Sequence, residues 1–434
     1  MPLSPLPVEN TSGGLGAYAR PADDRPPSPA FAPGLTGDAS APPLGLAVSG
    51  GSDSMAMLHL AARAAAATGQ RFEIATVDHR LRPEAGDEAR FVHEQCQRLG
   101  LPHQTLIWED HPGTGNLMQE GSRARYRLLG QWACQRGISR IALAHTADDQ
   151  AECFLMGLTR AAGLDGLSGM RPGWQEAGVT FLRPLLHESR AALRAFLRRE
   201  GQDWCEDPSN SNPRYLRARM RSLRAALEPA GIGLTQLRET IAHLARAQAL
   251  LRHETGATFA RIGTEEAGAL RLERAGFAAL HPEMQRRLIS AAIRWLSAAR
   301  HAPRAPMLAH LLERLSKEQP ATLGGCRFLF TQSALLICRE PRSLGPAVAA
   351  PGLWDQRWQI TGPLSPDLEL RALGAEGLRQ ATDWRETGLA REILLVSPGL
   401  WQGEILVAAP LAGSGAAKWQ AKLRQSFANF VLSH

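Results

Sequence analysis

The stretch Leu44-Gly-Leu-Ala-Val-Ser-Gly-Gly-Ser-Asp-Ser54 decides the fold of this chain. Its apolar run Leu44–Val48 predicts a buried β-strand, and the run Met55–Ala67 that follows the loop predicts a helix. A strand, a tight glycine turn and a helix N-terminus form an anion site, because backbone N–H groups point at the ligand and the helix dipole favours negative charge. The stretch therefore indicates a phosphate-binding loop.

Six residues of this loop are expected to bind the phosphates of a nucleotide: Ser49, Gly50, Gly51, Ser52, Asp53 and Ser54. The glycines allow positive φ and a close approach by phosphate oxygens, and the serines add hydroxyl donors. Asp53 would repel a phosphate unless a cation lies between them, which indicates Mg²⁺. An ordinary capped glycine turn is the structural alternative. The sequence has no Gly-x-x-x-x-Gly-Lys-[Ser/Thr] pattern, so this is not a Walker A loop.

Composition limits the class of protein. The 434 residues suffice for two or three domains, and the formal charge of +7 weakly favours a polyanionic partner. Six cysteines are scattered without a Cys-x-x-Cys pair, which argues against a structural zinc site and a disulfide framework and predicts a cytoplasmic protein. No apolar run approaches the length of a membrane span, so we expect no membrane partner.

The pattern along the chain predicts four regions. Residues 1–42 are rich in Pro, Gly and Ala and predict a disordered extension. Residues 43–210 alternate strand-like and helix-like segments, which predicts a parallel sheet covered on both faces. Residues 211–345 predict a mainly helical domain, and residues 350–434 predict a small mixed α+β domain.

The last two regions also contain strand signals. Cys326–Phe330 and Ala334–Cys338 predict a β-hairpin, because three polar residues separate two short apolar runs. Ile393–Val396 and Ile405–Ala408 are strand-like, and a terminal helix is expected from Ala416.

A second polar segment follows the predicted strand Ile138–Ala144. His145, either Asp148 or Asp149, and Glu152 recur every three or four residues, so they share one helix face. Such acids near a helix start could hold Mg²⁺ or bind an ammonium group, and N-capping by Thr146 is the alternative. The pair Asp78 and His79 likewise ends a strand. Because ligands of parallel sheets lie off the carboxyl ends of strands, we expect these segments to meet the phosphate loop.

The segment from 214 to 224 carries five arginines and a tyrosine. This composition suits contact with RNA phosphates and stacking on bases. A salt-bridged face near Glu206 and Asp207 is the alternative. The arginines of this segment that we expect to bind RNA are Arg214, Arg217, Arg219 and Arg221.

Taken together, these segments resemble the tRNA(Ile)-lysidine synthases of the PP-loop ATP pyrophosphatase superfamily, over roughly residues 44–340. The loop specifies only the superfamily. Its combination with Asp-Pro-Ser-Asn and the Arg-rich helix is specific to the lysidine synthases. The matching stretches are Ser49–Ser54, Val77–Arg82, Arg125-Tyr126, Ala144–Glu152, Arg183-Pro-Leu-Leu186, Trp204–Asn210 and Arg217–Arg221.

The resemblance implies a doubly wound parallel five-stranded sheet of the PP-loop, adenine nucleotide alpha hydrolase-like type. It also implies an ATP-dependent reaction at the CAU anticodon of tRNA(Ile). The C2 oxygen of cytidine 34 attacks the α-phosphate of ATP, pyrophosphate leaves, and the amine of free L-lysine then displaces AMP at C2. ATP, Mg²⁺, the tRNA and L-lysine are thus the implied ligands, and the chain is compatible with a homodimer.

The resemblance also assigns roles to residues. Asp53, Asp149, Glu152 and Arg125 are the expected catalytic residues, with Asp53 and Asp149 expected to hold Mg²⁺. Asp149 and Glu152 are the candidates to orient or deprotonate the lysine amine. The residues expected to bind ATP beside the loop are Asp78, His79 and His145, and those expected to bind tRNA on the preceding helix are Arg123 and Arg125.

Two departures from the family pattern concern these arginines. The usual Arg-x-x-Arg-Tyr is shortened here to Arg123-Ala124-Arg125-Tyr126, and Ala218 replaces an asparagine in the Arg-rich helix.

Two other functions remain as alternatives. A tRNA thiolase of the same superfamily would need paired cysteines, and their absence weighs against it. A degenerate RNA-binding protein without ATP turnover would not need the intact loop or Asp149 and Glu152.

Overall fold

The computed structural model describes residues 38, 40–81, 84–109, 117–176, 178–206 and 212–433. The chain forms two compact units, Met1–Gln248 and Ala249–His434. Nearly all of the predicted disordered extension lies outside the described residues, as do Arg82 and the Asp207–Asn210 part of the Asp-Pro-Ser-Asn motif. The four predicted regions stay a prediction.

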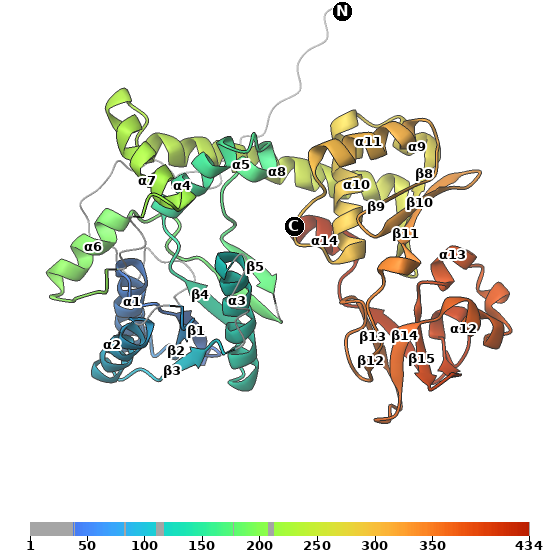
Figure 1. Ribbon diagram of the computed structural model, residues 1–434, viewed down its shortest axis with the longest axis horizontal. Helices are drawn as coiled ribbons and strands as arrows, with labels where there is room; N and C mark the ends of the chain where they lie inside the picture. Colours follow the sequence, from blue (N-terminus) through green and yellow to red (C-terminus); the bar gives the residue numbers. More distant parts are fainter. Residues whose placement is uncertain are drawn as a thin grey trace, which may run out of the picture. The chain divides into compact units, whose positions relative to one another are not determined.

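A six-stranded sheet in the order β3-β2-β1-β4-β6-β5 forms the centre of the first unit (Figure 1). Five of its strands are parallel, which confirms the predicted doubly wound sheet, and β5 adds an antiparallel edge. The strands are β1 (Leu44–Ala47), β2 (Phe72–Asp78), β3 (His103–Ile107), β4 (Arg140–Leu143), β5 (Gly173–Glu176) and β6 (Val179–Leu182).

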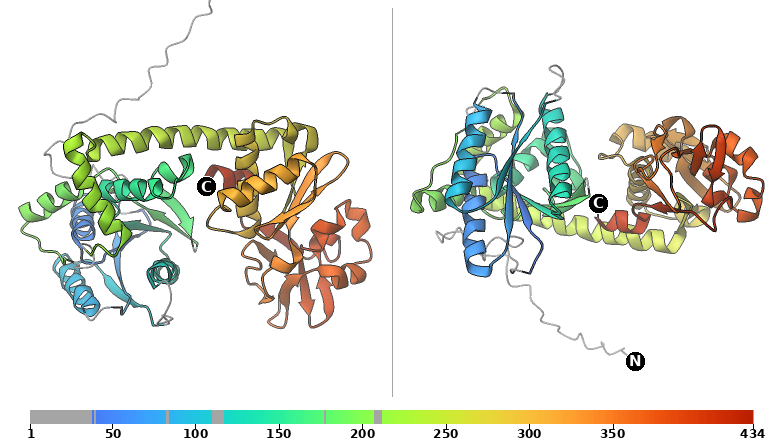
Figure 2. Two further views of the ribbon diagram at one scale, coloured as in Figure 1. Left: turned by 45° about the horizontal axis from the view of Figure 1, so that its top comes forward. Right: turned by 90° about the horizontal axis from the view of Figure 1, so that it is seen from below.

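Helices cover both faces of this sheet. On one face, side chains of α1, α2 and α6 pack with the strands in one apolar cluster, and on the other face α3 packs in a second cluster. Figure 2 shows α1 and α2 on the side of the sheet opposite α3. Burial on both faces explains the continuous apolar strands. The helices of this unit are α1 (Ser52–Thr68), α2 (Ala85–Arg98), α3 (Leu117–Gln135), α4 (Ala147–Leu158), α5 (Leu164–Leu167), α6 (Arg190–Arg199) and α7 (Leu216–Leu227).

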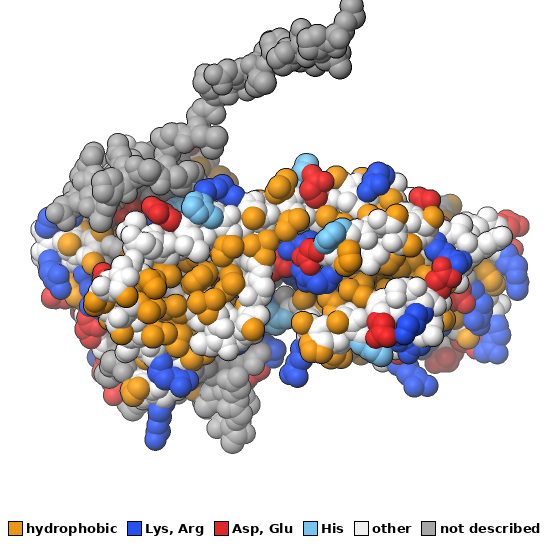
Figure 3. All heavy atoms as spheres, turned by 90° about the horizontal axis from the view of Figure 1, so that it is seen from above, with side chains coloured by type: hydrophobic (Ala, Val, Ile, Leu, Met, Phe, Trp, Pro, Cys, Tyr) orange, Lys and Arg blue, Asp and Glu red, His pale blue; other side chains and the backbone are white. Residues whose placement is uncertain are grey.

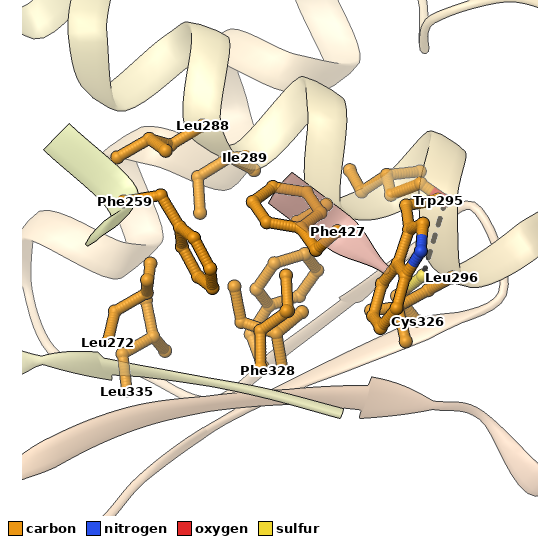
Figure 4. Packing of buried hydrophobic residues seen from close by; sticks show 14 of the residues in the cluster. Phe259, Leu272, Leu288, Ile289, Trp295, Leu296, Cys326, Phe328, Leu335 and Phe427 are labelled. Carbon is orange, nitrogen blue, oxygen red and sulfur yellow. Dashed lines mark hydrogen bonds between the residues drawn. The ribbon is translucent and has the colours of Figure 1, made fainter. Parts of the chain in front are cut away.

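The second unit is built on a five-stranded antiparallel sheet in the order β7-β8-β11-β10-β9. Helix α8 (Leu234–Ile262) leads into it. In the core of this unit, Phe427 lies between Phe259 and Trp295, with ring centroids 4.5 and 5.5 Å apart (Figure 4). The elements are β7 (Gly263–Glu266), β8 (Ala269–Glu273), α9 (Arg274–Ala278), α10 (Pro282–Ser297), α11 (Ala305–Ser316), β9 (Ala321–Leu323), β10 (Cys326–Phe330) and β11 (Ala334–Arg339).

The end of the chain forms two smaller sheets, β12-β14-β15-β16 and β13-β17, followed by a terminal helix. On the face drawn in Figure 3, cationic and anionic side chains of the second unit are interspersed. The elements are β12 (Val348–Ala349), β13 (Trp358–Thr361), β14 (Glu369–Ala372), α12 (Gly374–Gln380), α13 (Arg391–Leu394), β15 (Pro398–Gln402), β16 (Ile405–Ala408), β17 (Gln420–Leu423) and α14 (Phe427–Ser433).

The structure confirms some of the predicted elements of this unit and corrects others. The hairpin is present as β10 and β11, and Ile405–Ala408 is a strand. Ile393–Val396 is not a strand, because Ile393 in the helical turn α13 and Val396 in the turn after it bury their side chains against β11. The helix expected from Ala416 begins only at Phe427, since β17 first pairs with β13. No helix in the described part of the chain is long and apolar enough to span a membrane.

Candidate active site

The phosphate loop joins β1 to α1 at the carboxyl end of the sheet. Gly50 has φ of +85°, a conformation that glycine adopts without strain. Gly51 is the N-cap residue of α1. Because glycine has no side chain, it gives the first N–H groups of the helix no side-chain hydrogen bond. Ser54 instead ties the loop together, since its hydroxyl donates to the Gly51 carbonyl at 2.9 Å and accepts from the Ser49 N–H at 3.2 Å. The predicted strand, glycine turn and helix N-terminus are therefore present, and phosphate binding by this loop stays a prediction.

A segment distant in sequence packs on this loop. The N–H of Cys205 donates to the Gly50 carbonyl at 2.9 Å. Arg194 of α6 donates to the Ser52 hydroxyl at 3.2 Å and forms an ion pair with Glu206 at 3.0 Å. The described part of the Trp204–Asn210 motif thus supports the phosphate loop directly.

The acidic residues of α4 begin where β4 ends, beside β1 in the sheet. Thr146 caps α4, and the Oδ2 atom of Asp149 accepts from the Thr146 backbone N–H at 2.8 Å, which completes a capping box. The other oxygen of Asp149 faces Arg190. Asp149 therefore acts as a helix cap with one oxygen and belongs to the charged site with the other. Asp148 and Glu152 are buried next to it.

Arg190 links these carboxylates to the phosphate loop. Its Nε donates to Asp53 at 3.0 Å, and its two terminal nitrogens lie 3.4 Å from Asp149 and 3.4 Å from Glu152. Its backbone N–H donates to Asp148 at 2.8 Å. Arg190 is absent from the residues predicted from sequence. The available signal is its position, because an arginine in the first turn of a helix opposes the dipole unless acids surround it.

The charges of this cluster shift one another. Burial raises the pKa of Asp53, and the neighbouring Asp149 adds to this, while Arg190 opposes it. Burial also acts to raise the pKa of Asp149, but Arg217, Arg190 and the Thr146 N–H outweigh it and lower the pKa. For Arg190, burial alone would lower the pKa, yet the attraction of Asp53 and Asp149 raises it. Arg190 thus stays a cation between the two carboxylates.

Three arginines of α7 turn toward α4. Arg217 lies 3.1 Å from Glu152 and 3.8 Å from Asp149, and Arg221 donates to Glu152 at 2.9 Å. Arg224 donates to Asp148 at 3.0 Å. These arginines therefore form ion pairs with acids of α4, whereas Glu206 of the proposed alternative pairs with Arg194 and Asp207 lies outside the described residues. The RNA-binding role of this helix stays a prediction. Arg214 and Arg219 are exposed, and so is Arg217 despite its ion pairs.

Two histidines, His79 and His145, are predicted to bind ATP beside the phosphate loop. His79 packs its ring edge-on against Trp108, and its Nδ1 is buried without a hydrogen-bond partner among the described residues. Burial, with Arg125 adding to it and Asp78 opposing it, lowers the pKa of His79 to about 4. Burial and Arg183 lower the pKa of His145 to about 4 as well. Both rings are neutral at physiological pH. The Asp78 carboxylate accepts from the Arg80 N–H at 2.8 Å and so closes its own turn.

The two predicted arginines of α3 differ. Arg125 lies close enough to both histidines to lower their pKa values. Arg123 forms an ion pair with Glu120 at 2.8 Å. It also lines a surface cavity of about 340 Å³ that contains neither the phosphate loop nor the acids of α4, so this cavity is not the chemical centre.

The carboxylates fit the expected Mg²⁺. Asp53 Oδ2 and Asp149 Oδ1 both lie within 3.4 Å of one cationic group, the Arg190 guanidinium. Carboxylate oxygens are the donors that Mg²⁺ prefers, and the ion usually takes one or two of them together with substrate phosphates. The donor set next to the phosphate loop therefore suits this metal.

A family of protein domains, two related proteins and one solved structure are similar to this chain. A PP-loop domain family matches residues 32–227. A tRNA(Ile)-lysidine synthase of Ruegeria pomeroyi is 44% identical over 395 residues, which cover 90% of this chain and 94% of that protein. Another, of Hyphomonas neptunium, is 37% identical over 321 residues, 71% of this chain and 84% of that protein. A solved structure, the U34-tRNA thiolase NcsA from Methanococcus maripaludis, aligns with a TM-score of 0.41 and 16% identity over 47% of this chain and 72% of that chain.

Proposed function

The chain belongs to the tRNA(Ile)-lysidine synthases, and from this premise we propose how its residues carry out the ATP-dependent ligation of lysine to cytidine 34. The observation that carries the proposal is the ion-pair cluster around Arg190. It brings Asp53 of the phosphate loop within reach of Asp149 and Glu152, so that nucleotide activation and amine binding share one centre.

ATP binds with its phosphates on the loop Ser49–Ser54, where free N–H groups of α1 and the serine hydroxyls receive them. His79, packed on Trp108 with an unpartnered ring nitrogen, faces the base. The C2 oxygen of cytidine 34 attacks the α-phosphate and pyrophosphate leaves. The loop donors and Arg190 take up the charge that develops on the phosphates. Asp53 and Asp149 would hold Mg²⁺, which when bound would supply further positive charge there.

Lysine binds at the carboxylates of α4. In this structure, guanidinium groups of Arg190, Arg217 and Arg221 surround Glu152, so cations already occupy the space around this carboxylate. The ammonium group of lysine is a cation of the same charge and smaller size. Asp149, whose pKa is lowered, orients the ammonium group, and Glu152 accepts its proton before the neutral amine attacks C2 and displaces AMP.

The tRNA lies along the exposed arginines. Arg214, Arg217 and Arg219 are all exposed, and Arg217 lies beside the acids. Arginine suits phosphate contact and stacking on splayed bases of an anticodon loop. Arg125, which lies near both histidines, is proposed to contact the reacting nucleotide. A homodimer, a cytoplasmic location and the four-part domain division are retained as proposals.

The experiment that tests this function measures AMP formation from ATP with and without tRNA(Ile) and lysine. We expect AMP in quantity only when both are present, and we expect nucleoside mass spectrometry to find labelled lysine on cytidine 34. AMP and pyrophosphate formed equally well without tRNA or lysine would contradict the proposal.

A further inference from the structure

Arg183 and His145 form a hydrogen bond at neighbouring strand ends. His145 follows β4 and Arg183 follows β6, and these two strands pair in parallel. The Nε of Arg183 lies 3.0 Å from the Nδ1 of His145. A guanidinium group can only donate, so Nδ1 must be the acceptor in this bond.

Other contacts hold the Arg183 guanidinium in place. Its carbon lies 3.9 Å from the centroid of the Trp174 ring, and its NH1 donates to the Arg171 carbonyl at 2.7 Å. Trp174 is in turn stacked on Phe181, with centroids 5.1 Å apart and an interplanar angle of 21°. The donor is therefore built into the hairpin of β5 and β6, and it does not depend on a bound ligand.

The hydrogen bond decides where the ring of His145 carries its proton. A neutral imidazole has one N–H, and because Nδ1 accepts, that proton is on Nε2. Three cations face the ring from different elements, namely Arg183, Arg217 of α7 and Arg125 of α3, and Asp149 of α4 is the facing anion. Burial and these cations keep the ring neutral. In the part of the chain that the structure describes, His145 makes no other hydrogen bond, so its Nε2–H is available.

We propose that Arg183 is a positioning residue that holds His145 as the Nε2–H tautomer, so that the ring donates a hydrogen bond to an oxygen of the reacting nucleotides. The acceptor is an anionic phosphoryl oxygen or the C2 oxygen that attacks it. A neutral N–H group can stabilise the negative charge that develops on this oxygen in the transition state. It does so without adding a fixed charge beside Arg190. The inference rests on the proposed function and on the prediction that His145 is one of the residues that bind ATP.

Two substitutions of His145 separate the ring nitrogens. His145→Gln carries an amide N–H near the position of Nε2, whereas His145→Asn carries its amide near Nδ1. We expect His145→Gln to retain most of kcat and His145→Asn to lose about 100-fold, because removal of one donor to a developing oxyanion costs about that much. Equal activity of the two variants would overturn the proposal.

Arg183→Met tests the positioning role through a readout other than activity. In the ¹⁵N spectrum of the histidine side chains, we expect Nδ1 of His145 to show the acceptor-type shift in the parent protein and a mixture of tautomers in Arg183→Met. Losing the donor and one cation also raises the pKa of His145, so kcat of this variant should fall below about pH 6 while the parent remains flat. An unchanged tautomer with an unchanged pH profile would contradict the proposal.

Arg136→Met is the matched control. Arg136 donates to Glu73, at the opposite end of the strands from the loop, so neither the spectrum nor the pH profile should change. The spectrum is independent of turnover. Absence of lysine-dependent AMP formation in the parent protein would therefore defeat the proposed function, whereas a wrong tautomer in an active parent would defeat only this inference.

Discussion

Asp53 is the residue that joins the phosphate loop to the charged cluster, through its 3.0 Å contact with Arg190. Asp53→Asn keeps the shape of the side chain and removes its charge. We expect turnover to fall by at least about 100-fold, because Asn no longer forms an ion pair with Arg190 and is a poorer ligand for Mg²⁺ than a carboxylate. The dissociation constant for tRNA should stay within about threefold, since this side chain lies among partly buried groups of the loop. Filter binding and AMP release measure the two effects, and a large loss of tRNA binding would show that the roles are not separate.

Gly50 supplies the turn of the loop. With φ of +85°, an added Cβ would lie 3.4 Å from the Cys205 sulfur. We expect Gly50→Ala to cost about 1–2 kcal/mol in the free energy of unfolding, because an L side chain is strained in this region, and to raise the KM for ATP. Gly86→Ala in α2 is the control, since no atom lies within 4 Å of the added group. Urea denaturation of both variants checks the difference, and equal stability would refute the strain.

At the scale of single residues, the sequence predicts the acidic residues of the site better than it predicts the arginine with which they pair. Asp53, Asp149 and Glu152 lie in short motifs with a chemical reason for each position, and the structure brings them together around one group. That group, Arg190, belongs to no such motif, and its contacts join segments 137 residues apart. Long-range pairs of this kind depend on how α6 returns to the sheet, which local spacing does not reveal.

Helix α7 carries arginines with two different surroundings. Arg224 pairs with the buried Asp148 at 3.0 Å, whereas Arg219 is exposed. We expect Arg224→Gln to lower the free energy of unfolding by about 1–3 kcal/mol, because it leaves a buried carboxylate without this partner. Arg219→Gln should change stability by less than about 0.5 kcal/mol.

Binding of tRNA should show the opposite order for the two variants. Arg219→Gln is expected to weaken binding and to reduce the slope of log affinity against log salt by about one, as for a lost phosphate contact. Arg224→Gln should leave that slope unchanged. Denaturation and filter binding over a range of salt concentrations test the pair, and a slope that changes only in Arg224→Gln would reverse the assignment.

At the scale of elements, the pattern of apolar residues predicts a helix or a strand correctly only where local preference and packing in the folded chain favour the same element. The strands of the first sheet are buried on both faces, so their apolar runs are unambiguous. Ile393–Val396 is equally apolar, but four residues cannot distinguish a strand from a helical turn that buries the same side chains. The neighbouring β11 settles the choice in favour of α13.

For the first unit as a whole, stability should depend on the neutral state of three partly buried histidines. The pKa values of His79, His103 and His145 are lowered from 6.5 to about 4, in each case chiefly by burial. Between these two values the unfolded chain binds more protons than the folded one, so stability is fully present above about pH 6.5 and is lost as the pH falls toward 4.

Each histidine contributes up to about 1.4 kcal/mol per pH unit in this window. Denaturation at a series of pH values measures the slope, and His103→Gln should flatten it by removing one of the three groups. An identical slope in this variant would exclude His103 as a contributor.

The length of α8 has a consequence for how the chain can be divided. Its first half supplies Leu237 and Ile241 to the apolar cluster that holds Phe154 and Met220, and its second half supplies Phe259 and Ile262 to the core of the second unit. A fragment that ends with α7 at Leu227 would leave the back of α4 open to water, directly beneath Asp148 and Glu152. The boundary between the two units, after Gln248, therefore falls inside a helix, so a cut there would interrupt α8 and separate the two sets of apolar side chains that it carries.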